Sequence, residues 1–310
     1  MFKERILFFD LLRILAILIV VLGHVCAALG SPGWYGIQNF DYTSFAGTGV
    51  ILFLIVSGAA LTVSHPRVKI GEYKEFIFKR AIRLYPAYWI ACAMAVLVAY
   101  LFAYQNFLGF SLIQYVLTFS GFYAFLGGQF GGSFGGPILA VGWYIGLIIS
   151  LYLLYPLIAR LFDRNPHIAI LILFVVSLVS RLFCGYLQSY GYGYRMTDWF
   201  PLCRVFEFGL GIYLIKTGLY LKINLNGAAR RLIIFGSELS FYVFLTHYPF
   251  IFLNIYMNYG LSAYEYYAIV LIIIVPVLSI GLYILDGRLK GVIDKLMKNA
   301  VSSPVSSETE

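Results

Sequence analysis

Long apolar stretches separated by short polar ones run along most of this chain. Eight of them approach the roughly 20 residues that a helix needs to cross a bilayer, and they lie near 6–29, 45–64, 84–104, 138–160, 167–187, 199–216, 232–256 and 264–286. A ninth stretch, 111–126, is shorter and is followed by the glycine-rich sequence GGQFGGSFGGP at 127–137. The pattern predicts an all-α transmembrane bundle of about 8–10 spanning helices. We expect a single membrane-embedded domain over 1–298 and a disordered tail over 299–310.

The composition agrees with this pattern. Hydrophobic residues make up 61% of the chain and charged residues only 12%, about half the charged share of an ordinary soluble domain. Aromatic residues reach 18%, and such rings commonly lie where lipid meets water or line a polar cavity within a bundle. The four cysteines follow no motif spacing, so they predict neither a disulfide framework nor a metal site.

The basic residues predict the orientation of the bundle. If the N-terminus is cytoplasmic and 111–126 does not cross singly, the 22 lysines and arginines lie on the cytoplasmic side with four exceptions: Arg195 in an outer loop, and Arg13, Arg181 and Arg204 within spans. This predicts cytoplasmic termini, with 111–126 re-entrant, interfacial or one of a crossing pair. Loops facing anionic membrane lipid account for the net charge of +8 without any nucleic-acid partner.

The first span contains three ionisable residues, Asp10, Arg13 and His24. Such residues are costly inside a membrane unless they are paired or face a cavity, so they indicate a functional site. Asp10 and Arg13 are three residues apart and can pair on one helix face. Arg13 and His24 are separated by about 20° around the helix and roughly 16 Å along it. The structural alternatives are a simple ion pair for Asp10 with Arg13, and a hydrogen bond to a neighbouring helix for His24.

A second group lies in EFIFKRAIRLYPAYW, residues 75–89. Arg80 and Arg83 are one helical turn apart at the start of the third span, which Pro86 is well placed to open. Paired guanidinium groups suit a polyanion arriving from the cytosol, because arginine binds phosphate with two parallel hydrogen bonds. Arginines at this position can also simply bind lipid headgroups.

These residues together resemble acyltransferase family 3, bacterial-type membrane O-acyltransferases that modify polysaccharides, lipid-linked sugars and some small molecules. The resemblance implies a location in the cell's inner membrane. Asp10, Arg13 and His24 match the family's first-helix motif, and the sequence from Arg80 to Trp89 matches its second. Weaker matches lie at 49–58, 142–156 and 239–249. Ile51 and Ile148 depart from the family pattern, and Ile148 stands where one large branch has a glutamate, so a mechanism that needs that carboxylate is not expected.

The resemblance implies that Arg80 and Arg83 hold the nucleotide end of cytosolic acyl-CoA, with acetyl-CoA the expected donor and no metal required. The donor's arm would then pass Arg13, which Asp10 orients, and present its thioester near His24. A neutral imidazole suits general-base activation of a glycan hydroxyl, or nucleophilic acceptance of the acyl group. Both routes remain open at this stage.

Four further residues are candidates for an accessory or acceptor role: Trp143, Tyr144, Ser240 and His247. Aromatic belts explain the first two equally well, and a satisfied bundle histidine explains the last. Arg204 and Glu207 are three residues apart and predict a buried structural pair. The alternative function is a transporter or flippase of a glycan or lipid intermediate, but no repeat of one half of the chain in the other supports it.

Overall fold

A computed structural model describes residues 5–29, 42–102, 111–127, 139–193, 195–252 and 261–302, and this part of the chain is helical without strands. The predicted all-α class is therefore confirmed. The long helices are α1 (Leu7–Ala28), α2 (Tyr42–Ser64), α3 (Tyr73–Phe102), α6 (Trp143–Arg164), α7 (Pro166–Ser189), α9 (Pro201–Thr217), α10 (Gly227–Phe252) and α12 (Val275–Ser302). The short helices are α4 (Leu112–Ser120), α5 (Tyr123–Gly127), α8 (Met196–Trp199) and α11 (Ala263–Ile269).

Six helical stretches in the described part are long and apolar enough to cross a membrane. They are Leu7–Ala28, Ser44–Ser64, Tyr73–Val98, Ala140–Arg164, Pro166–Ser189 and Ala263–Met297. The other two predicted spans correspond to α9, which has 17 residues, and to α10, which carries Glu238 and His247 among its apolar residues. Large apolar side chains are exposed along the outward faces of α1, α7 and α12, as lipid contact requires. The orientation of the bundle in a membrane stays a prediction.

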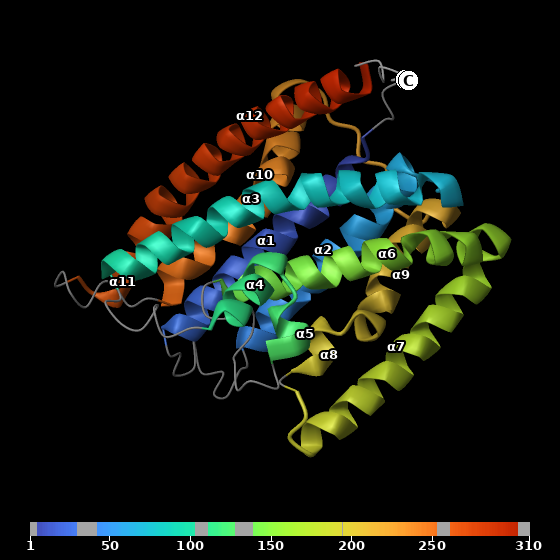
Figure 1. Ribbon diagram of the computed structural model, residues 1–310, viewed down its shortest axis with the longest axis horizontal. Coiled ribbons are helices and arrows are strands. Elements are labelled where there is room, and N and C mark those ends of the chain that lie inside the picture. Colours follow the sequence, from blue (N-terminus) through green and yellow to red (C-terminus); the bar gives the residue numbers. More distant parts are fainter. Residues whose placement is uncertain are drawn as a thin grey trace, which may run out of the picture.

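Close backbone contacts hold the centre of the bundle together. Helices α1 and α2 cross its middle, and α7 and α12 lie at opposite edges (Figure 1). A β-carbon on Gly58 of α2 would lie 2.0 Å from the carbonyl oxygen of Phe208, and one on Gly211 of α9 would lie 1.8 Å from that of Ile55. Small residues allow such contact between membrane helices. The α2–α9 interface therefore depends on glycine at both positions.

Helix α3 begins earlier than expected. Pro86 lies inside the helix rather than at its start, because α3 begins at Tyr73. Proline removes one backbone hydrogen bond, and the residues around it are anchored elsewhere. The side chains of Tyr85, Tyr88 and Trp89 donate hydrogen bonds to the carbonyl oxygens of Ser120, Thr118 and Phe119, at 2.8, 2.5 and 2.9 Å. This aromatic motif thus docks α3 onto the C-terminal end of α4.

The ambiguous stretch 111–126 forms two short helices, α4 and α5. They are divided at Gly121, whose φ of 79° is left-handed, a conformation that glycine adopts readily. With nine and five residues, neither helix is long enough to cross a bilayer. This agrees with the prediction that the stretch does not cross singly. The glycine-rich sequence after Gly127 lies outside the described residues.

The last span continues beyond its predicted end. Helix α11, the π-helical turn at Val270–Ile274 and α12 follow one another without a break. Helix α12 extends to Ser302, so its final turn includes the first four residues of the predicted tail at 299–310. Residues 303–310 lie outside the described part of the chain.

Candidate active site

A cavity of 590 Å³ lies among α1, α2, α3, α6, α10 and α12. Six of the predicted site residues line it, namely Asp10, Arg13, Arg80, Arg83, Tyr144 and Ser240. His24, His247 and Trp143 are not part of its wall. The structure thus brings Arg13 of the first motif together with Arg80 and Arg83 of the second in one cavity. The two histidines lie outside this cavity.

The two acidic residues on the cavity wall are both paired with Arg5. This side chain donates to the two carboxylate oxygens of Asp10, at 2.9 Å each, and to Glu238 of α10 at 2.6 Å. Burial opposes the charge of Arg5, but its hydrogen bonds with these two carboxylates raise the pKa of Arg5. The expectation that Asp10 pairs directly with Arg13 was therefore wrong, because the carboxylate of Asp10 is paired with Arg5 instead.

Asp10 and Arg13 are connected through a serine instead. The hydroxyl of Ser237 donates to Asp10 at 2.6 Å, and the guanidinium of Arg13 donates to the same hydroxyl at 3.4 Å. Asp10 is only 5% exposed, so this arrangement satisfies a buried carboxylate without neutralising Arg13. The charge of Arg13 remains available to the cavity.

Arg13, Arg80 and Arg83 together place three guanidinium groups on the cavity wall. None of them forms an ion pair with an acidic side chain among the described residues. The Nε atom of Arg80 is buried and has no hydrogen-bond partner in the described part, while its guanidinium lies 5.8 Å from the ring centre of Phe76. Buried donors without partners are costly. This wall is therefore suited to an anionic ligand with several charges.

A further cation, Lys290, was not recognised from the sequence. Its ammonium donates to Asp286 at 2.5 Å and to the carbonyl oxygen of Arg83 at 2.9 Å. Tyr242, which also lines the cavity, donates to the same carboxylate at 2.7 Å. Asp286 is fully buried. The spacing of four residues between Asp286 and Lys290 at the end of the last span was the available signal.

The two histidines contact each other. Nδ1 of His24 and Nε2 of His247 are 2.9 Å apart, and the rings lie at 10° to one another with centroids 5.2 Å apart. Nδ1 of His247 lies 3.0 Å from the carbonyl oxygen of Val243, one turn earlier on α10. His247 is completely buried. Two candidates considered separately in the sequence therefore form one hydrogen-bonded unit.

Three aromatic rings form one part of the cavity wall, and one of them contacts His247. Phe53, Tyr144 and Phe244 line the cavity and contact one another, with ring centroids 5.2 to 6.2 Å apart. Phe244 also contacts His247, at 6.0 Å between ring centroids. Phe244 is thus part of the cavity wall on one side and of the histidine surroundings on the other.

The remaining candidates have supporting positions. Trp143 packs edge-on against Tyr144, with their ring centroids 6.3 Å apart. Ser240 faces the cavity but donates to the carbonyl oxygen of Ser237 at 2.8 Å, and it is not hydrogen-bonded to His247.

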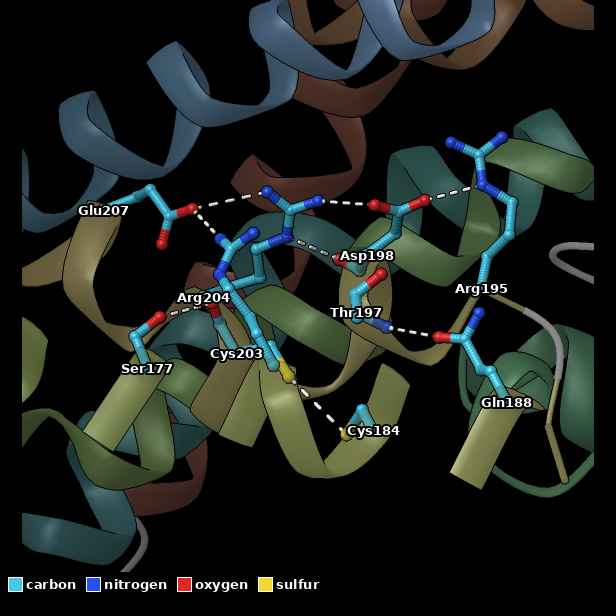
Figure 2. A network of polar contacts seen from close by, with 10 residues as sticks. Ser177, Cys184, Gln188, Arg195, Thr197, Asp198, Cys203, Arg204 and Glu207 are labelled. Atoms are coloured by element: carbon cyan, nitrogen blue, oxygen red, sulfur yellow. Dashed lines mark hydrogen bonds and ion pairs between the residues drawn. The ribbon is translucent and has the colours of Figure 1, made fainter. Parts of the chain in front are cut away.

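A separate polar network joins α7, α8 and α9 (Figure 2). Arg204 contacts Glu207 at 3.3 Å, which confirms the predicted buried pair, and Arg181 binds the same carboxylate. Arg204 also binds Asp198 at 2.7 Å, and Arg195 holds the other oxygen of Asp198 at 2.6 Å. These ion pairs connect the three helices to one another.

Comparison with known proteins identifies the class. A family model described as an acyltransferase domain matches residues 6–222, most of the chain. The chain belongs to this acyltransferase family, and the resemblance to acyltransferase family 3 is confirmed. It is therefore a multi-pass integral membrane protein of an acyltransferase family.

One curated relative is Nodulation protein 10 from Rhizobium leguminosarum bv. viciae, which is 27% identical over 187 residues. The match covers 56% of this chain and 49% of that protein, so the chain spans about half the length of this relative. No solved structure matches. The family match includes Arg13, His24, Arg80 and Arg83, whereas His247 lies outside the matched residues.

Proposed function

We propose that this acyltransferase moves an acyl group, most simply acetyl, from cytosolic acyl-CoA to a hydroxyl of a polysaccharide or lipid-linked sugar at the inner membrane. The observation that supports this best is the cavity wall with Arg13, Arg80 and Arg83, three guanidinium groups without an acidic partner in the described part of the chain. Coenzyme A carries several phosphates on one end and a long, uncharged arm on the other. A chamber with clustered cations and an apolar far wall is complementary to both ends.

The donor lies in the cavity with its phosphates at Arg80 and Arg83. These residues belong to the set of basic residues predicted to face the cytoplasm, where acyl-CoA is found. The arm extends along α1 past Arg13 towards the rings of Phe53, Tyr144 and Phe244. His24 lies roughly 16 Å further along α1 than Arg13, and Phe244 lies in the cavity wall next to His247. The thioester therefore passes Phe244 to reach the histidines.

The chemistry then takes place at His24. In the direct route, His24 takes the proton of the acceptor hydroxyl while the hydroxyl oxygen attacks the thioester carbonyl carbon. The carbon–sulfur bond breaks, an ester forms, and the imidazolium returns its proton to the departing thiolate to give free coenzyme A. In the alternative route the same imidazole first accepts the acyl group and then passes it to the hydroxyl. Both routes need an unprotonated ring nitrogen on His24.

The test is transfer of radiolabelled acetyl from acetyl-CoA by the purified protein, with and without candidate acceptors. His24→Asn removes the base but keeps a hydrogen-bonding side chain, and we expect it to lose transfer by about the 10²–10⁴-fold that a general base contributes. Acetyl-CoA binding should be retained, because donor affinity comes from the arginine end. A folded His24→Asn protein that keeps most of its transfer would contradict the proposed chemistry.

A further inference from the structure

The hydrogen bonds of the histidine pair determine which ring nitrogen carries each proton. The carbonyl oxygen of Val243 can only accept, so Nδ1 of His247, 3.0 Å away, must carry a proton. His247 is 0% exposed, and a doubly protonated, charged ring would lose its hydration there. The neutral ring has one proton, which lies on Nδ1. Its Nε2 atom is therefore an acceptor.

The same argument extends to His24. Since Nε2 of His247 carries a lone pair, the 2.9 Å contact requires Nδ1 of His24 to donate the proton. A neutral His24 then has its lone pair on Nε2. The opposite arrangement would place the lone pair of Nδ1 on His247 against the carbonyl oxygen of Val243, with no hydrogen bond between them.

We propose that His247 is a positioning residue that holds His24 in its Nδ1–H tautomer, so that Nε2 of His24 is the atom that takes the proton or the acyl group. This inference rests on the proposed role of His24. His247 does not line the donor cavity, and it acts through the ring it contacts. Its near-parallel packing against His24, at 10° between ring planes, also fixes the direction in which Nε2 points.

The tautomer can be observed directly. The chain contains four histidines, so protein labelled with nitrogen-15 in histidine alone gives a simple spectrum in lipid nanodiscs, and loss of signals in His24→Asn assigns His24. We expect a protonated Nδ1 and an unprotonated Nε2 on His24 in the wild-type protein. In His247→Ala, a second population with a protonated Nε2 should appear. A wild-type His24 protonated on Nε2 would overturn the proposal.

Kinetics provide a second readout. His247→Ala should lower kcat about 10²-fold, within the contribution of a general base, with KM for acetyl-CoA unchanged. His247→Gln should recover much of the rate and the single tautomer, because the glutamine carbonyl can accept the proton from Nδ1 of His24. His167→Ala is the matched control: His167 contacts Tyr213 at 3.1 Å, away from the cavity, and its loss should change neither readout.

The outcomes separate this inference from the proposed function. An active His24→Asn protein would overturn the role of His24 and this inference with it. An inactive His24→Asn protein together with a fully active His247→Ala protein would overturn this inference alone. If His247→Ala does not fold, the wild-type spectrum and His247→Gln still decide the question, since a Gln variant without activity or without the single tautomer contradicts positioning through the hydrogen bond.

Discussion

Donor affinity should depend on the two arginines of α3, and the structure allows the effect to be sized. Arg80→Ala and Arg83→Ala each remove a guanidinium group from the cavity wall. A hydrogen bond to a charged group contributes about 1.5–3 kcal/mol, and each 1.4 kcal/mol is tenfold in affinity. Full loss of both contacts would weaken acetyl-CoA binding about 10²–10⁴-fold. Arg83 is exposed and more strongly screened, so we expect a value near 10².

The two arginines should not contribute equally. Nε of Arg80 is buried without a partner in the described part of the chain, so a bound phosphate would satisfy it. Lysine keeps the charge but has no donor at the position of Nε. Arg80→Lys should therefore recover only part of the affinity lost in Arg80→Ala, whereas Arg83→Lys should recover most of its smaller loss.

The assay is isothermal titration of acetyl-CoA into purified protein in nanodiscs, with Lys79→Ala as the matched control. Lys79 is adjacent in sequence, loses the same charge, and instead pairs with Glu75 on the exposed face of α3, outside the cavity. Its replacement should change the dissociation constant less than twofold. If the double arginine variant binds acetyl-CoA as tightly as Lys79→Ala does, the two arginines bind lipid headgroups and the donor site lies elsewhere.

Three further outcomes are expected. Gly211→Ala should lower the unfolding temperature by an amount equivalent to about 1–3 kcal/mol, because its new methyl would lie 1.8 Å from the carbonyl oxygen of Ile55, whereas Gly281→Ala meets no atom within 4 Å and should not. Phe244→Leu should raise acetyl-CoA hydrolysis in the absence of an acceptor, measured as thiol release, because a smaller side chain would then separate the cavity from His247. Unchanged hydrolysis would show that the ring is not a barrier. Lys290→Ala should cost more thermal stability than Lys290→Ala with Asp286→Ala, because only the single variant leaves a buried carboxylate without its cation; equal losses would contradict this pairing.

The sequence predicted the helices well because membrane spans are long, apolar and separated by charged loops. It also predicted residues that share one helix, since Arg80 and Arg83 are a turn apart and both face the cavity. The prediction that Pro86 opens the third span was wrong, because α3 already begins at Tyr73. Proline is favoured at helix starts, but here hydrogen bonds from neighbouring side chains such as Tyr85 anchor the helix around it.

The spacing of residues along the sequence could not predict which residues of different helices contact each other. His24 and His247 are 223 positions apart, and periodicity within a helix does not specify how far that helix is rotated towards its neighbour. The partner of Asp10 was missed for a related reason: Arg5 precedes the helix, where helical spacing rules do not apply.

Arg5, just before α1, and Arg13 and His24 within it each contact a residue of α10. Glu238 contacts Arg5, Ser237 contacts Arg13, and His247 contacts His24. During synthesis α1 enters the membrane long before α10 exists, so the nascent first helix carries these groups into lipid before their partners are made. The local pair of Arg5 with Asp10 can form at once, five residues apart, and it neutralises the carboxylate during that interval. The contacts of Arg13 with Ser237 and of His24 with His247 can therefore form only after α10 has inserted.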